Sequence, residues 1–60
     1  MITYYIIRSS DGGEYWAWES AQLAREALNR YIKRGFLKDG RVFALRLDVH
    51  TDRFTVTEET

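Results

Sequence analysis

The pattern of apolar and polar residues changes period along the chain, and the change separates one helix from several strands. Between Ser20 and Gly35, apolar side chains recur every three or four residues, which is the period of an amphipathic helix. Ser20 suits an N-cap, Gly35 suits the left-handed residue that closes a last turn, and Phe36 is placed for the apolar contact that often follows. The predicted apolar stripe consists of Leu23, Ala24, Ala27, Leu28, Tyr31 and Ile32.

Four other segments have the composition of β-strands. Residues 2–8 are rich in branched and aromatic side chains and are apolar on both faces, whereas residues 41–49 and 53–58 alternate with a period of two. Residues 14–18 follow Asp11-Gly12, a pair suited to a two-residue hairpin turn. The order strand, strand, helix, strand, strand predicts a single α+β domain over residues 1–60, with a four-stranded antiparallel sheet and one amphipathic helix packed on one face.

The predicted turn fixes a register for the first hairpin. With a two-residue turn, Tyr5 lies opposite Trp18, and Ile7 lies opposite Trp16. These four side chains would then share one face of the hairpin.

We expect the helix to cover the other face of this hairpin. Ala17 lies there, and together with Ala24 and Ala27 it would let the helix approach the sheet closely. The core predicted on this side contains Ile2, Tyr4, Ile6, Phe43, Leu45, Leu47, Val49, Phe54 and Val56.

A single helix covers only one face of a sheet, so apolar surface remains on the other. Three aromatic rings and an isoleucine make a patch of about 500 Å², which is large enough to indicate a binding surface. The residues predicted to bind a partner are Tyr5, Ile7, Trp16 and Trp18, with Arg46 on the same face. If the two faces are assigned the other way round, Tyr4, Ile6 and Tyr15 are left uncovered instead.

Composition limits what else the chain can do. It has 60 residues, no cysteine and one histidine, so its small core depends on apolar packing, and a four-ligand zinc site is excluded. No apolar run is long enough to span a bilayer and the first residues do not resemble a signal peptide, so we expect a soluble, cytoplasmic, unprocessed chain. We expect no cofactor and no metal.

Nine basic and nine acidic residues cancel, but they are unevenly distributed. Residues 25–41 contain six cations and two anions, whereas the segment from residue 48 onward contains four anions and one cation. Cations are common at a helix C-terminus because the helix dipole favours them there. They also form a second candidate contact, suited to an acidic partner, which consists of Arg30, Lys33, Arg34 and Lys38.

The single histidine, His50, lies between Asp48 and Asp52, a spacing that in principle suits a divalent metal or an acid–base pair. No third ligand or nucleophile accompanies these residues, and the segment is more typical of a solvated strand end. The serines suit turns and a helix cap, and no glycine-rich phosphate loop is present. We therefore expect a protein that is not an enzyme.

These observations predict a small interaction module, a binder or inhibitor, whose partner is another protein or a second copy of itself. The alternative is a nucleic-acid partner, with single-stranded bases stacked on the same aromatic face beside Arg46 and Arg53. The neutral charge and the acidic final segment favour a protein. In size the chain is similar to the small stand-alone binders that viruses and mobile elements encode to block host machinery, although no motif links it to them.

Overall fold

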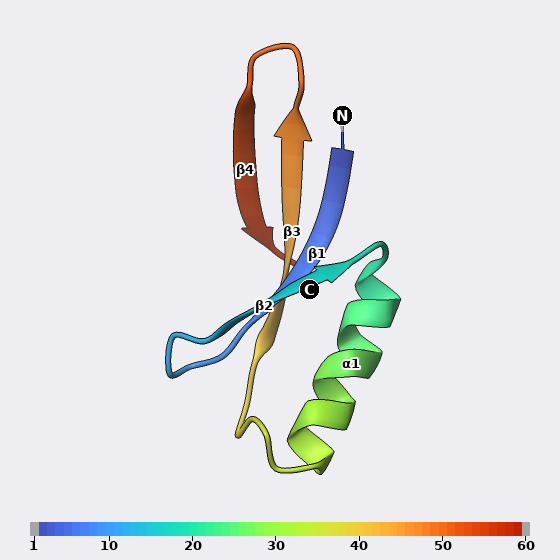
Figure 1. Ribbon diagram of the computed structural model, residues 1–60, viewed down its shortest axis with the longest axis vertical. Coiled ribbons are helices and arrows are strands. Elements are labelled where there is room, and N and C mark those ends of the chain that lie inside the picture. Colours follow the sequence, from blue (N-terminus) through green and yellow to red (C-terminus); the bar gives the residue numbers. More distant parts are fainter. Residues whose placement is uncertain (1, 60) are drawn as a thin grey trace.

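The computed structural model describes residues 2–59 and contains four strands and one helix (Figure 1). The elements are β1 (Ile2–Arg8), β2 (Glu14–Trp18), α1 (Ala21–Lys33), β3 (Arg41–Asp48) and β4 (Arg53–Glu58). They form one antiparallel sheet in the order β2-β1-β3-β4 with the helix on one face. The predicted α+β fold is therefore confirmed. The molecule is elongated, about 40 × 21 × 18 Å, because β3, β4 and their connecting turn extend beyond the helix (Figure 1).

Both predicted ends of the helix are formed by the expected residues. The Ser20 hydroxyl accepts a hydrogen bond from the amide of Leu23 at 3.1 Å. Gly35 adopts a φ of 80°, and the Phe36 amide then donates to the carbonyl of Tyr31 at 2.9 Å. The rings of Phe36 and Tyr31 also meet, with centroids 6.3 Å apart. This arrangement is a Schellman motif with its apolar contact, which satisfies carbonyls that the helix end would leave unpaired.

The helix covers the face of the sheet opposite to the one that we predicted. The buried core joins Ala24 and Ala27 of the helix to Ile7 of β1, Val42 of β3 and Leu37 of the preceding loop. Four half-buried side chains pack around this core: Tyr5, Trp18, Leu28 and Tyr31. The alanines lie at the contact between helix and sheet, as expected, but on the side of Ile7 and Val42.

The first hairpin explains part of this difference, because its turn contains three residues rather than two. The Ser9 amide donates to the carbonyl of Gly13 at 2.9 Å, and Gly12 has a φ of 91°. This is the loop in which a tight turn is followed by a left-handed glycine. The register is therefore one residue away from the predicted one at this end, and Ile7 lies opposite Tyr15 rather than Trp16.

A β-bulge in β2 then restores the predicted register. Tyr5 lies opposite Trp18, as expected, so β2 contains one extra residue between this pair and the pair Ile7–Tyr15. The bulge falls at Trp16 and Ala17, and the peptide bond between these two residues is cis. Because of the extra residue, Tyr15 and Trp18 both face the helix, whereas Trp16 faces the other way.

The strand order supplies the second reason for the position of the helix. β2 and β3 run parallel, because each is antiparallel to β1, which lies between them. A helix that connects two parallel strands of one sheet almost always forms a right-handed crossover. The strand order therefore selects one face for the helix, and the alternation of apolar residues does not contain this information.

The helical stripe is narrower than predicted. Ala24 and Ala27 are fully buried and Leu28 and Tyr31 are half-buried, in keeping with the prediction. Leu23 and Ile32 lie at opposite edges of the stripe and remain 49% and 40% exposed. The helix therefore contacts the sheet through small residues at its centre, and its larger aliphatic residues flank the contact.

Replacing Ala27 with leucine tests this helix contact. Ala27 has no exposed surface, so the added side chain should push the helix away from the sheet and lower the free energy of unfolding by about 1–3 kcal/mol. Asn29→Leu adds a similar side chain at an exposed position of the same helix and should change the stability by no more than about 0.5 kcal/mol. Urea denaturation followed by circular dichroism measures both. Equal stability of the two variants would contradict the contact.

Candidate functional site

The face of the sheet that the helix leaves uncovered is apolar over most of its length, and we call it the open sheet face. A groove of about 580 Å³ runs over it and has contributions from all four strands. The residues that line the groove are Ile2, Tyr4, Ile6, Arg8, Glu14, Trp16, Leu45, Leu47, Phe54 and Val56. Most of these apolar residues were predicted to form the core beneath the helix, and that prediction is wrong.

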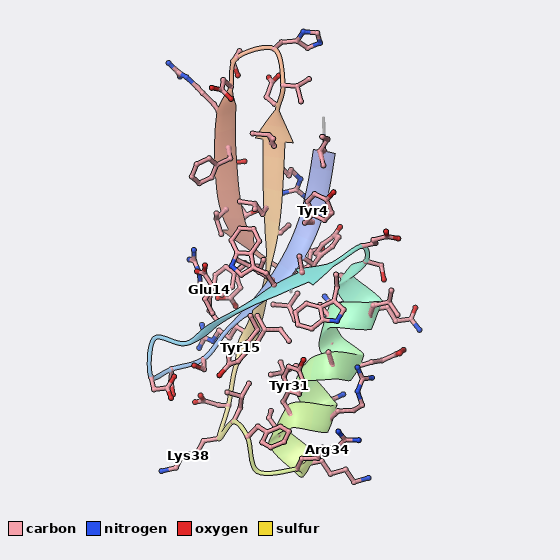
Figure 2. The ribbon with its side chains drawn as sticks, viewed as in Figure 1. Tyr4, Glu14, Tyr15, Tyr31, Arg34 and Lys38 are labelled. Carbon is pink, nitrogen blue, oxygen red and sulfur yellow. The ribbon has the colours of Figure 1, made fainter. Side chains whose placement is uncertain are left out.

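The groove has a buried floor and exposed aromatic edges. Ile6 is fully buried at its centre. Trp16 on the outer strand β2 is 57% exposed, and Phe54 on the other outer strand, β4, is 67% exposed. Ile2 and Tyr4 of β1 are 42% and 45% exposed, and Figure 2 shows Tyr4 near the start of that strand. The open sheet face therefore exposes large apolar side chains that a monomeric protein ordinarily buries.

A chain of polar contacts holds Trp16 in place beside the groove. The Trp16 indole Nε1 donates to Glu14 Oε1 at 2.8 Å, and Arg8 Nε donates to Glu14 Oε2 at 2.8 Å. The Arg8 guanidinium lies over the ring of Phe43, 5.1 Å from its centroid. The contacts link β2, β1 and β3 across the sheet. They hold the indole in one orientation, which lowers the side-chain entropy that covering it would cost.

The pKa of the Glu14 carboxyl group is lowered from its ordinary value by these contacts. The hydrogen bond from the Trp16 indole is the largest cause, and the hydrogen bond and charge of Arg8 add to it. Both donors favour the ionised carboxylate. Glu14 is therefore charged at neutral pH, and its charge is compensated on the open sheet face itself.

A second ion pair lies at the same end of the open sheet face. Arg41 Nη1 lies 3.1 Å from Glu58 Oε1. In the register of β3 and β1, Arg41 lies opposite Arg8, which places the two ion pairs side by side. The opposite end of the face, where Ile2 lies opposite Leu47, carries apolar side chains. The face thus has an apolar end and a charged end at which both signs are present.

The predicted partner-binding residues are divided between the two sides of the sheet. Trp16 lies on the open sheet face, whereas Tyr5, Ile7 and Trp18 pack beneath the helix. The Trp18 ring meets that of Tyr31, with centroids 6.3 Å apart. These three residues form part of the interior because the helix covers their side.

Arg46 also lies on the helix side of the sheet. It neighbours Thr3 and Thr55 in the register, and its Nη1 donates to the hydroxyl of Thr57 at 2.9 Å. Arg46 and the exposed aromatic residues of the groove therefore belong to opposite sides of the sheet. The nucleic-acid alternative requires a stacked base to lie beside Arg46. A base stacked on those rings would instead lie on the opposite side of the sheet.

The predicted basic contact surface lies at the C-terminal end of the helix. Its four residues are exposed: Arg30, Lys33, Arg34 and Lys38. Arg30 and Lys33 occupy the last turn, and Arg34 caps it. Figure 2 shows Arg34 and Lys38 at the end of the molecule farthest from the β3–β4 turn. None of these four residues lines the groove on the open sheet face.

The residues around His50 form a turn. The Asp48 carboxylate accepts a hydrogen bond from the His50 amide at 3.0 Å, and Asp52 adopts a φ of 54°. Within residues 2–59, no group of three histidine or acidic side chains is arranged to hold a metal ion.

In the same part of the chain, no helix has the length and apolar character needed to cross a membrane.

The two tryptophans should differ in their effects on stability. Trp18→Ala removes a half-buried ring from beneath the helix and should lower the free energy of unfolding by about 2–3 kcal/mol. Trp16→Ala removes a mostly exposed ring and should cost less than about 1 kcal/mol. Urea denaturation measures both free energies of unfolding. A low micromolar protein concentration keeps any contribution from association between copies of the chain small. A larger loss for Trp16→Ala than for Trp18→Ala would contradict the assignment of the two faces.

The contact between Glu14 and Trp16 should weaken in acid. Because the pKa of Glu14 is lowered in the folded state, its stabilising contribution is present above about pH 4.3 and is lost as the pH falls through the lower folded value. The indole Nε1–H resonance of Trp16 should therefore be constant above the ordinary pKa of a glutamate, about 4.3, and should shift only at lower pH. Glu14→Gln should abolish this shift. An indole resonance that titrates equally in the Gln variant would exclude Glu14 as its cause.

Comparison with known proteins supplies no relative from which a function could be transferred. The chain matches no protein-family model, no curated protein and no solved structure. Any function assigned to it must therefore be argued from the open sheet face and the residues that surround it.

Proposed function

We propose that this chain is a small binding protein that docks onto another protein through its open sheet face. The observation that supports the proposal is the apolar groove of about 580 Å³ with exposed aromatic edges at Trp16 and Phe54. Exposed aromatic residues beside an apolar surface, with charged residues at one end, are typical of protein interfaces. A surface of this kind can act by binding alone.

The gain from covering this face is large for so small a chain. Strands lie about 4.8 Å apart and rise about 3.4 Å per residue, so four strands of 7, 5, 8 and 6 residues have a plan area of roughly 420 Å². At about 25 cal/mol per Å², covering it gains on the order of 10 kcal/mol before the costs of ordering and association. An apolar sheet face of this size favours a partner that can exclude water from all four strands.

The charges of the molecule favour a protein partner over a nucleic acid. Phosphate contacts need a surplus of cations, but the chain carries nine basic and nine acidic residues. On the open sheet face, Arg8 and Arg41 are each paired with a glutamate. Rings that stack bases are ordinarily flanked by unpaired cations, and the groove lacks this arrangement among the residues that line it.

Photo-crosslinking in the cell that produces the protein tests the proposal. A photoreactive phenylalanine analogue at Phe54, which lies on the open sheet face, should form a covalent adduct with a protein. The same analogue at Thr55, the next residue of β4 and also exposed, points to the other side of the sheet and should form at least tenfold less adduct.

Two results would contradict this function. Equal adduct from positions 54 and 55 would mean that the open sheet face has no preferred contact. Tight binding of a fluorescent single-stranded oligonucleotide, weakened steeply by salt, would favour the nucleic-acid alternative instead.

A further inference from the structure

Building on the protein-binding role above, we propose that the partner of the open sheet face is a second copy of this chain. The two copies would pack face to face around a two-fold axis, as two sheets do in a β-sandwich. Each helix would then lie on the outside of the dimer, on the side of its sheet that faces away from the other copy.

The open sheet face has both a hollow and the side chains that can fill one. The groove of about 580 Å³ lies between two outer strands, and each of these strands carries a mostly exposed ring, Trp16 on β2 and Phe54 on β4. A two-fold axis brings the same residues of both copies to the interface. The rings of one copy can therefore enter the groove of the other, in the way that side chains of packed sheets interdigitate.

The charges on this face are compatible with an identical partner. The charged end of the open sheet face carries two cations and two anions, in the pairs Arg8–Glu14 and Arg41–Glu58. The whole chain has no net charge at neutral pH. Two copies therefore do not repel each other, and a protein without net charge is prone to associate. A partner selected by charge would instead be expected to meet a surface of one sign.

The interior of one copy is too small to leave so much apolar surface uncovered. Seven apolar residues are buried within residues 2–59, three of them are alanines, and Ile6 and Ile7 are the largest side chains that are fully buried. Chains of this length have a thin stability margin that a disulfide, a metal or a second subunit commonly supplements, and this chain has no cysteine. A second copy would extend the interior of both molecules at once.

The size of the face suits a small, weakly associating dimer. Its plan area of roughly 420 Å² ignores the relief of the side chains. Two copies would cover about twice that area in total, which is below the roughly 1,600 Å² of a standard interface and in the range of weak, concentration-dependent complexes. A lipid surface fits less well, because the basic residues at the helix end, such as Lys33 and Arg34, do not surround the groove.

The mass of the purified protein in solution tests this inference. Light scattering over a range of concentrations should give twice the mass of the 7.1 kDa chain at high concentration. Phe54→Glu places a charge within the proposed contact and should raise the dissociation constant at least about 100-fold. Thr55→Glu places the same charge on the other side of β4 and should leave the dimer intact.

A second measurement does not depend on whether the Phe54 variant folds. In Trp18→Phe, Trp16 is the one remaining tryptophan, and its fluorescence emission should shift to longer wavelength on dilution as the dimer separates. A monomeric mass at every concentration up to about 1 mM, with emission that does not change on dilution, would overturn the dimer. A larger assembly that Phe54→Glu leaves unchanged would also overturn it, because its contacts would lie elsewhere, for example along the outer strands.

These results separate the dimer from the broader function. A monomer in solution that still crosslinks in the cell through position 54 to a different protein excludes the second copy and retains the binding role. A monomer that forms no adduct at position 54 excludes both.

Discussion

The packing of two helical alanines against the sheet is the contact on which the rest of the structure depends. Ala24 and Ala27 rest on Ile7 and Val42, and their small side chains let the helix approach closely. A single helix can cover only one side of the sheet, so this contact determines which residues become interior and which become surface. The groove on the opposite side is a direct result of it.

The elements were predictable from the sequence because each has a local signal. The bounds of β1, β2 and β4, the cap at Ser20 and the glycine closure at Gly35 follow from hydrophobic period and terminal residues alone. β3 ends one residue earlier than predicted, since Val49 belongs to the turn. That some aromatic surface would remain uncovered also followed from counting apolar faces against one helix.

The identity of that surface was not predictable from the same signals. Period-two alternation shows which residues share a face, but it does not show which face the helix covers; strand order and crossover handedness decide that. Phe54 and Leu47 were therefore assigned to the core although they line the groove. Leu37 was overlooked because it lies in a loop, where a single buried leucine has no periodic neighbours.

The extra residue in β2 has a consequence for how the chain can vary in evolution. Tyr15 and Trp16 are neighbours in sequence, yet one contacts the helix through Tyr31 and the other lies beside the groove. A substitution at the first residue therefore alters the interior, whereas a substitution at the second alters the surface beside the groove. The surface at Trp16 can thus change in shape and chemistry while the packing beneath the helix stays the same.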